Sequence, residues 1–299
     1  MKILVTGASG LVGSALVPYL TQKGHEVVRL VRAQPKAGAA EIRWDSEKGV
    51  TDPAQLEGFD AVIHLAGENI SDGRWTDEKK RRIRESRMKG TRLLSEALAR
   101  LSAPPAALIS ASAIGFYGSR GAEVLNEQSA SGDDFLAEVC REWELATRPA
   151  AERGLRVANL RFGVILSEEG GALAKMMTPF KLGVGGRVGS GEQYMSWITL
   201  NDTIGAIYHA LTRADVHGPV NVVAPNPVTN SEFTKKLGDA LSRPTLLPAP
   251  AFALRLAFGE MADALLLSSM RVEPLRLKES GFVFQYPELE GALRHILKK

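Results

Sequence analysis

The sequence predicts an α/β protein built on a doubly wound parallel sheet, with a smaller mixed lobe towards the C-terminus. Two observations lead to this fold class. Strand-like and helix-like segments alternate through the first 165 residues, and a glycine-rich turn joins the first strand to the first helix. Alternation of this kind implies right-handed crossovers, which place helices on both faces of a parallel sheet.

The first half of the chain contains apolar stretches with the length and composition of strands. They are Ile3–Val5, Glu26–Val31, Glu41–Trp44, Asp60–Leu65, Ala106–Ser112 and Arg156–Leu160. The first of them is apolar throughout, as expected for a strand that is buried on both faces. Helical patterns lie between these stretches, over Ser14–Lys23, Asp77–Leu101 and Phe135–Arg153. Gly24 ends the first helix, and Asp133 and Asp134 are candidates to cap the third.

The alternation loosens after Gly163. Gly170-Gly171 and the run Gly183–Gly191 interrupt regular structure and predict loops. One further strand is expected at Val220–Ala224, and helices are expected over Asn201–Thr212, Ser231–Leu241, Ala251–Leu267 and Leu289–Leu297. We therefore expect a first domain over residues 1–165 that is completed by elements of residues 200–225. Residues 166–299 are expected to form an interleaved second lobe, with a distinctive tail over about residues 245–295.

Composition limits the partners of this chain. The chain has 299 residues and a formal net charge of +3, which is too small to indicate nucleic acid or an anionic membrane as a partner. A basic run over residues 79–84 contains no aromatic residue and is flanked by Asp77, Glu78 and Glu85. We therefore interpret this run as a solvated helix face, in preference to a nucleic-acid surface.

Cysteine usage and hydropathy indicate the cellular compartment and exclude some kinds of site. Cys140 is the only cysteine, which excludes an internal disulfide and a cysteine zinc site, and we expect no metal. The first strand begins within two residues of Met1, which leaves no room for a signal peptide. No apolar run approaches the roughly 20 residues of a membrane span. These features predict a cytoplasmic protein without a membrane partner.

The glycine-rich turn within Lys2–Gly13 predicts a dinucleotide site. Gly7 permits a tight turn off the strand, Gly10 lets the backbone approach a pyrophosphate, and Gly13 allows the helix to pack closely on the strand. Free N–H groups at the helix start would face the phosphates. The alternative is a turn without a ligand, but its position after a strand and before a helix favours nucleotide binding. The loop residues expected to contact the cofactor are Gly7, Ser9, Gly10, Leu11, Val12 and Gly13.

The end of the second predicted strand indicates which dinucleotide is bound. An Asp or Glu there would bind the ribose hydroxyls of NAD, but the chain reads Leu30-Val31-Arg32, with Lys36 following. Arginine can form charge-assisted bonds to a 2′-phosphate, so Arg32 favours NADP(H) over NAD(H), with an exposed surface arginine as the alternative. Leu65-Ala66-Gly67, after the fourth strand, is expected to lie along the adenosine ribose, and His64 is interpreted as a packing residue.

Motifs in three places, taken together, point to a family. They are Thr6–Gly13, His64–Gly67, and Ser110–Ala113 followed by Phe116–Gly118, and they resemble the extended short-chain dehydrogenase/reductase family of sugar-nucleotide epimerases and dehydratases. Three further segments resemble an atypical subgroup, known only as "epimerase family", that has its own C-terminal domain. These segments are Gly67–Ile70, Phe135–Glu144 and Gly189–Ile198.

The resemblance implies a Rossmann domain, an NADP(H) cofactor and a substrate pocket beneath the second lobe. It also implies that Arg87, on the long helix Asp77–Leu101, contacts the cofactor, with a solvated arginine as the alternative. The family's catalytic pair is a tyrosine and a lysine four residues later, in which the tyrosine moves a proton and the lysine lowers its pKa. Leu136 and Cys140 occupy these positions, and Phe135–Arg153 contains neither Tyr nor Lys. The usual mechanism therefore does not transfer to this chain.

Other side chains are candidates for the missing roles. Ser112 matches the family's active-site serine and Tyr117 lies in a turn that could face the nicotinamide, so these two are the predicted proton donors. The alternatives are a strand-capping serine and a structural tyrosine. The loop Gly183–Gly191 is expected to fold over a ligand. The predicted lining of the substrate pocket is Glu68, Lys175, Tyr194 and Trp197, although packing explains Trp197 equally well.

Three functional hypotheses follow from these residues. The first is an NADP(H)-dependent oxidoreductase or epimerase-like enzyme that acts on an unidentified small molecule. The second is a protein that binds NADP(H) without chemistry, as a redox sensor or scaffold, which the missing Tyr and Lys favour. The third is a nucleotide-sugar epimerase or dehydratase, in which the basic region Gly183–Arg187 would meet a diphosphate. We expect a monomer or a homodimer.

Overall fold

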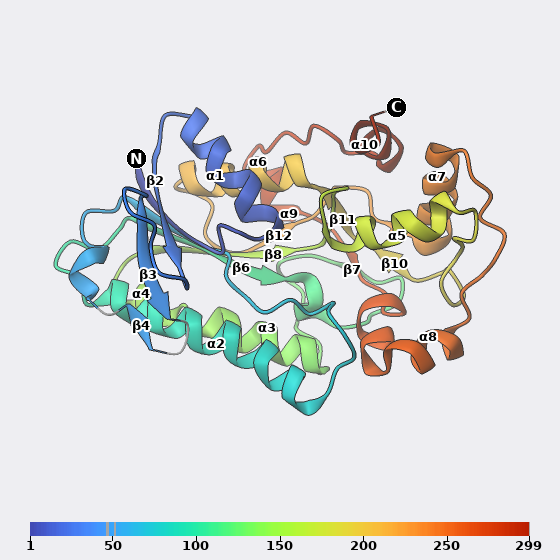
Figure 1. The fold of residues 1–299 in the computed structure, drawn as a ribbon, viewed down its shortest axis with the longest axis horizontal. Coiled ribbons are helices and arrows are strands. Elements are labelled where there is room, and N and C mark those ends of the chain that lie inside the picture. Colours follow the sequence, from blue (N-terminus) through green and yellow to red (C-terminus); the bar gives the residue numbers. More distant parts are fainter. Residues whose placement is uncertain (46–47, 51, 299) are drawn as a thin grey trace.

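The computed structural model describes residues 1–45, 48–50 and 52–298. Its centre is an eight-stranded sheet with the order β12-β8-β6-β5-β1-β2-β3-β4 (Figure 1). All neighbouring strands pair in parallel except β3 and β4, so the predicted doubly wound fold class is confirmed. The strands are β1 (Lys2–Thr6), β2 (Glu26–Val31), β3 (Glu41–Asp45), β4 (Gly49–Val50), β5 (Ala61–His64), β6 (Ala107–Ala113), β8 (Arg156–Phe162) and β12 (Gly218–Val222).

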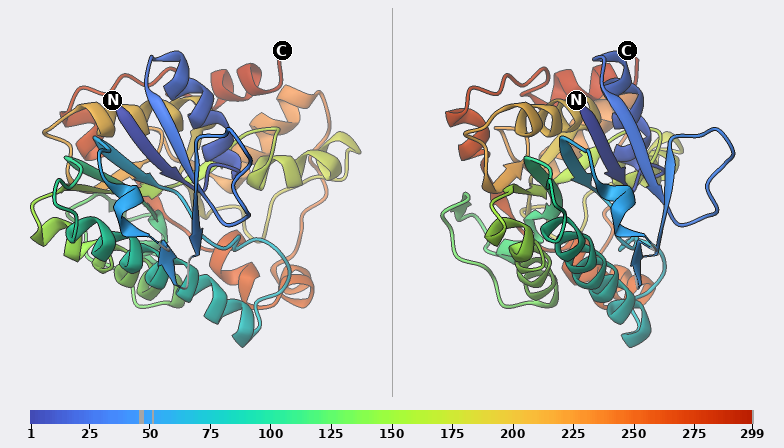
Figure 2. Two further views of the ribbon diagram at one scale, coloured as in Figure 1. Left: turned by 60° about the vertical axis from the view of Figure 1, so that its left-hand side comes forward. Right: turned by 90° about the vertical axis from the view of Figure 1, so that its left-hand side faces the viewer.

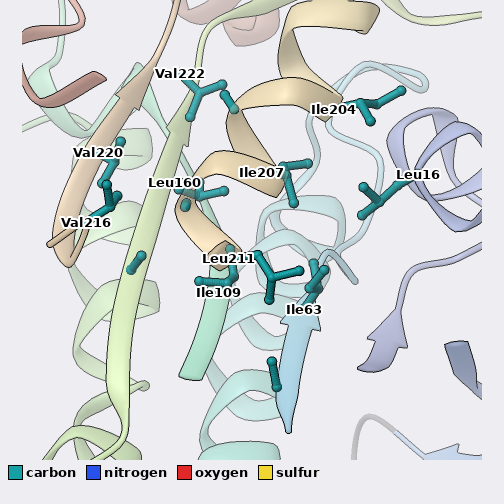
Figure 3. Packing of buried hydrophobic residues seen from close by; sticks show 14 of the residues in the cluster. Leu16, Ile63, Ile109, Leu160, Ile204, Ile207, Leu211, Val216, Val220 and Val222 are labelled. Atoms are coloured by element: carbon teal, nitrogen blue, oxygen red, sulfur yellow. The ribbon is translucent and has the colours of Figure 1, made fainter. Parts of the chain in front are cut away.

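Helices cover both faces of this sheet, as the views in Figure 2 also show. One face carries α1 (Leu11–Gln22) and α6 (Leu200–Thr212), which pack against each other. The other face carries α2 (Asp77–Ala99), α3 (Phe135–Leu145), α4 (Arg148–Glu152) and the short η1 (Pro53–Leu56). Figure 3 shows the core beneath α6, where Ile207 and Leu211 meet Ile109 and Leu160 of the sheet. Burial of these aliphatic side chains holds the helical layer on the strands.

The order of the strands fixes the point at which the winding direction reverses, where folds of this class have a crevice. From β1 the chain winds outward through β2 and β3, and it then returns to β5 on the other side of β1 before continuing to β6, β8 and β12. The carboxyl ends of parallel strands meet at one edge, and ligands of such folds bind where the winding direction reverses. This point lies between β1 and β5, directly above the glycine-rich turn.

Two of the predicted helices are wrong in their extent. The helix expected over Phe135–Arg153 is divided into α3 and α4, because Pro149 has no N–H and its ring would clash with the carbonyl of Leu145. The helix expected over Ala251–Leu267 is also divided. Its first part, α8 (Ala251–Phe258), ends at Gly259, whose φ of +62° is left-handed. A π-helical turn, η3 (Ala262–Leu266), follows.

The second half of the chain builds a mixed lobe from small pieces of structure. Short strands pair as β9 (Val164–Leu166) with β11 (Trp197–Thr199), β10 (Tyr194–Met195) with β13 (Val228–Thr229), and β14 (Arg271–Val272) with β7 (Val124–Leu125). Its helices are α5 (Gly171–Lys181), α7 (Asn230–Leu241), α8, η3, α9 (Leu275–Glu279) and α10 (Leu289–Ile296). The loop predicted at Gly170-Gly171 is therefore the start of a helix, whereas residues 183–191 contain only isolated bridges.

This lobe lies beyond the carboxyl edge of the sheet (Figure 1). The turn η2 (Ile114–Tyr117) follows β6 and leads towards it, and β9 and β11 continue from the end of β8. Within the described residues, no helix is both long and apolar enough to cross a bilayer.

Candidate functional site

The glycine-rich turn leaves backbone donors free at the start of α1. Gly7 has a φ of +69°, and its carbonyl accepts a hydrogen bond from the Gly10 N–H at 3.0 Å. The first helical bond runs from the Ser14 N–H to the Gly10 carbonyl, so the three preceding N–H groups have no acceptor within the helix. These groups belong to Leu11, Val12 and Gly13, and a helix terminus with free N–H groups favours an anion.

The glycines of this turn differ in what surrounds them. A Cβ on Gly13 would lie 2.2 Å from the Gly7 carbonyl oxygen, so the close approach of helix and turn requires glycine. A Cβ on Gly10 would meet only that same oxygen, at 3.4 Å, and would otherwise point into open space. Gly10 is therefore free of steric demands from the protein itself, which fits a position kept small for a ligand.

A hydrogen-bonded chain links this turn to the helices on the opposite face. Thr6 Oγ1 accepts the N–H groups of Leu65 (3.1 Å) and Ala66 (3.2 Å) and lies 2.7 Å from His64 Nδ1. His64 Nε2 lies 2.9 Å from Thr91 Oγ1, which also accepts the indole N–H of Trp143 at 2.9 Å. The backbone after β5 is thereby held against β1. The roles of Thr6 and Thr91 were missed by sequence reasoning, because the hydrogen bonds of their hydroxyls join residues that are far apart in the chain.

The hydrogen bonds from Thr6 through His64 to Thr91 require a neutral imidazole on His64. Thr6 Oγ1 already accepts two N–H groups, so its own proton must go to His64 Nδ1, which leaves the imidazole proton on Nε2. His64 is fully buried, and burial lowers the pKa of its imidazole to about 4. The prediction that His64 is a packing residue is confirmed.

We expect this histidine to make the fold sensitive to acid. The unfolded chain takes up the proton near the ordinary pKa of about 6.5, whereas the folded protein does so only near pH 4. Stability is therefore complete above pH 6.5 and falls as the pH drops from 6.5 to 4, by about 3 kcal/mol at the lower end. Urea titrations across this range would show the slope. His64→Gln should flatten it, and an unchanged slope in that variant would contradict the assignment.

Arg87 lies in the crevice beyond β5. Its guanidinium carbon is 4.9 Å from the centre of the Trp143 ring, and a Cβ on Gly67 would lie 3.5 Å from it. Burial lowers the pKa of Arg87, and no carboxylate among the described residues hydrogen-bonds to it. Its one hydrogen bond in the described chain goes from Nη1 to the Ile83 carbonyl at 3.2 Å. A guanidinium has five donor hydrogens, so most of them remain available to a ligand.

Charged residues gather near the ends of β2 and β5. Glu68 pairs with Lys79 at 2.8 Å, and the hydrogen bond from Lys79 lowers the pKa of this carboxyl, with smaller contributions from Arg82 and Arg32. Arg32 is exposed at the end of β2. Lys79 is almost completely buried, so the interpretation of the basic run as a solvated face is wrong at this residue. Its burial follows from the ion pair with Glu68.

The two predicted proton donors, Ser112 and Tyr117, form hydrogen bonds within a buried polar network. Ser112 is 2% exposed and donates to Glu144 Oε1 at 2.8 Å, and the same carboxylate accepts both Nε and Nη2 of Arg161. Tyr117 is fully buried. Its hydroxyl donates to Asn221 Oδ1 and accepts from Arg161, and burial raises its pKa to about 12. Neither hydroxyl reaches a substrate in this conformation, because packing and the Arg161–Glu144 pair hold both inside.

The positions of the family's catalytic pair carry no acid or base. Leu136 is partly exposed and belongs to an apolar cluster with Ile70, Trp75 and Leu265. Cys140 is buried below it, and burial raises the pKa of its thiol to about 12, which keeps it protonated. A Cβ on Gly115 would touch Leu136 at 3.3 Å. The surface offered to a ligand at this point is therefore hydrocarbon.

The predicted pocket residues differ in their burial and in their contacts. Trp197 is fully buried and its indole N–H donates to the Asn226 carbonyl, so its assignment to a pocket wall is wrong and packing explains it. Lys175 of α5 donates to the carbonyl and hydroxyl oxygens of Ser71 and thereby bridges the loop after β5 to the second lobe. Tyr194 is partly exposed and stacks under Arg271, a residue that sequence reasoning missed.

The sheet, the glycine turn and the arginines around the crevice are those of a dinucleotide-binding α/β protein. Residues 3–224 match the model of the NAD-dependent epimerase/dehydratase family, and the chain belongs to this family. Residues 249–296 match a domain of unknown function, DUF1731, which covers α8 to α10.

Relatives resemble this chain along its whole length. Epimerase family protein Mb2239 of Mycobacterium bovis is 45% identical over 291 residues, which are 97% of this chain and 96% of the relative. A crystal structure of human epimerase family protein SDR39U1 (isoform 2) with NADPH superposes with a TM-score of 0.91, at 35% identity and full coverage of both chains. The nucleoside-diphosphate sugar epimerase of Corynebacterium glutamicum has a TM-score of 0.83 at 41% identity, over 99% of this chain and 58% of that one.

Proposed function

We propose that this protein is an NADP(H)-dependent oxidoreductase or epimerase-like enzyme that acts on a small molecule. The observation that carries the proposal is Arg87, a partly buried guanidinium beside Gly67 that has one hydrogen bond in the described chain. Burying a charge without a partner is costly, so such a residue is expected where a ligand supplies the missing acceptors. The NADPH in the human relative supports the choice of ligand.

The residues of the crevice fit a nicotinamide dinucleotide. The N–H groups at the start of α1 and the small Gly10 suit a pyrophosphate, and Arg87, which lies beside Gly67, suits a ribose of the cofactor. Glu41, the first acid after β2, is occupied by the Arg29 side chain and the Lys36 N–H. Arg32 is then the residue available at the adenosine ribose, where a 2′-phosphate is the matching group.

The bound cofactor would supply hydride transfer at its nicotinamide ring. Trp143 fixes the plane of Arg87, and the chain Thr6–His64–Thr91 fixes Trp143 in turn. Leu136 excludes water from one wall of the crevice. Because Ser112 and Tyr117 are held inside the protein, a substrate that is reduced here takes its proton from water.

Two alternative functions are each supported by one observation. A non-catalytic NADP(H) sensor or scaffold is favoured by the hydrocarbon surface of Leu136 at the family's tyrosine position. A nucleotide-sugar epimerase or dehydratase is favoured by the relative from Corynebacterium glutamicum, which carries that description. The hydrocarbon wall around Leu136 suits the polar hydroxyls of a sugar poorly, so we rank this alternative third.

The test compares NADPH and NADH consumption by the wild-type protein across a panel of aldehydes and ketones. We expect consumption with NADPH, and we expect Arg32→Ala to weaken NADPH binding about 10-fold to 100-fold while leaving NADH unchanged, through loss of charge-assisted bonds. Arg87→Met should abolish turnover, and Arg92→Met, an exposed arginine of the same helix, is the matched control. Tight NADPH binding without turnover on any compound would favour the sensor instead.

A further inference from the structure

Arg271 in β14 carries a guanidinium that has no hydrogen bond or ion pair within the part of the chain that the structure describes. Its Nε is buried and has no hydrogen-bond partner among the residues that the structure describes. The contact that holds it is aromatic, because its guanidinium carbon lies 5.0 Å from the centre of the Tyr194 ring. Stacking of this kind fixes the plane of an arginine without using any of its donors.

Two other arginines, one buried and one partly buried, have hydrogen-bond partners. Arg161 stacks on Phe116 and also forms a bidentate ion pair with Glu144. Arg156 donates three hydrogen bonds to backbone carbonyls. Arg87 differs from both, and it lies in the cofactor crevice. Arg271 shares this combination of a stacked ring and unused donors, which points to a second place where a ligand supplies the acceptor.

Arg271 lies on the side of the crevice that the second lobe covers. Tyr194 of β10 donates its N–H to Ser269 Oγ at 2.9 Å, and the Ser269 N–H donates to Ser119 Oγ at 3.0 Å. Ser119 follows η2, the turn at the carboxyl end of β6. In Figure 1 this region, marked by β7 and β10, lies between α5 and α8. Arg271 is therefore tied, through Tyr194 and Ser269, to the segment that follows the carboxyl end of β6, and ligands of this fold bind at that end of the sheet.

Charged residues near this arginine are paired with each other, as Arg120 is with Glu123, and the remaining partly exposed residues include apolar ones. Phe116 and Met270 pack on the buried cluster that contains Val272, the neighbour of Arg271. Leu136 and Leu265 are partly buried on the adjacent cluster, between α3 and η3. Hydrocarbon walls with one placed cation fit a ligand that is apolar over most of its surface and carries a single anionic group.

We propose that Arg271, stacked on Tyr194, binds the oxyanion of a substrate whose remaining body is apolar, a carboxylate or a phosphate monoester. Both anions match the paired donors of a guanidinium, so they share this chemistry. The proposal rests on the proposed function and assigns its substrate class. It differs from a sugar nucleotide, which would bring hydroxyls, a base and two phosphates into the same space.

The test is calorimetric titration of the NADPH-saturated full-length protein with hexanoate, hexyl phosphate, neutral hexanamide and UDP. We expect one of the two six-carbon anions to bind at least about 10-fold more tightly than hexanamide. The two anions distinguish the two sources of the oxyanion. In Arg271→Gln this preference for an anion should disappear. In Arg271→Lys, which keeps the charge but loses the paired donors of the guanidinium, the preference should be reduced. Arg294→Gln, an exposed arginine paired with Glu290, is the control and should bind as the wild type does.

The outcomes separate this proposal from the proposed function. Equal binding of the anions by the wild type and by both Arg271 variants would overturn the assignment of Arg271. UDP binding that depends on Arg271, without binding of either six-carbon anion, would overturn the substrate class in favour of a sugar nucleotide. NADPH affinity is measured for every variant. Failure of the wild type to bind NADPH would contradict the proposed function instead.

Discussion

Replacing Glu144 with alanine is expected to lower the free energy of unfolding by about 3–5 kcal/mol, the cost of leaving a buried charge without its partner. The Arg161 side chain is 3% exposed and gives two hydrogen bonds to this carboxylate, of 2.7 and 2.8 Å. Ser112 would lose its acceptor at the same time. Urea denaturation at pH 7 measures the loss, which should appear as a lower midpoint.

Glu142→Ala is the matched control on the same helix. Glu142 pairs with Arg84 near the surface, where ion pairs contribute about 1 kcal/mol or less. Equal losses in the two variants would contradict a buried structural role for Glu144. A double variant that also removes the cation, Glu144→Ala with Arg161→Met, should be more stable than Glu144→Ala alone, because no unpaired charge remains.

Gly10→Ala is expected to weaken NADPH binding about 10-fold to 100-fold while the protein stays folded. The backbone of Gly10 has a φ of −77° and a ψ of 172°, which alanine adopts readily, and a Cβ there would meet only the Gly7 carbonyl oxygen, at 3.4 Å. The added methyl group would instead occupy the space that we assign to the pyrophosphate. Fluorescence titration with NADPH measures the affinity, and thermal unfolding without cofactor reports the fold.

Gly291→Ala serves as the control for this experiment. Gly291 lies within α10, and a Cβ on it would have no neighbour within 4 Å. This variant should bind NADPH as the wild type does and should be slightly more stable, because alanine favours helices. If Gly10→Ala bound NADPH with unchanged affinity, the pyrophosphate could not lie over the helix start as we infer.

The sheet and its flanking helices were predictable because their signals are local. The run Ile3–Val5 is apolar at every position and became β1, and Glu26–Val31 became β2 without any change of bounds. Errors arose where one residue overrides the periodic pattern around it. Pro149 and Gly259 each divided a predicted helix, through a lost backbone donor and a left-handed turn.

The candidate site was predictable on its cofactor side and much less so on its substrate side. Gly7 and Gly13 are required by backbone geometry and close packing over a few residues, and Gly10 fits a position kept small for a ligand, so their spacing alone indicates them. The partners of Ser112 and Tyr117 are Glu144, Arg161 and Asn221, which come from three other elements. No short-range pattern records such contacts, and burial by distant residues turned two candidate donors into structural groups.

The sequence by itself determined the fold class, the cofactor-binding turn and the absence of the usual Tyr and Lys, since each depends on the identity of residues close together in the chain. Tertiary structure alone decided which polar side chains have partners. It buried Trp197 and satisfied Arg161, and it left Arg87 and Arg271 with donors to spare. The physical reason is that pairing and desolvation depend on residues brought together by folding, and we propose that ligands bind at these two arginines.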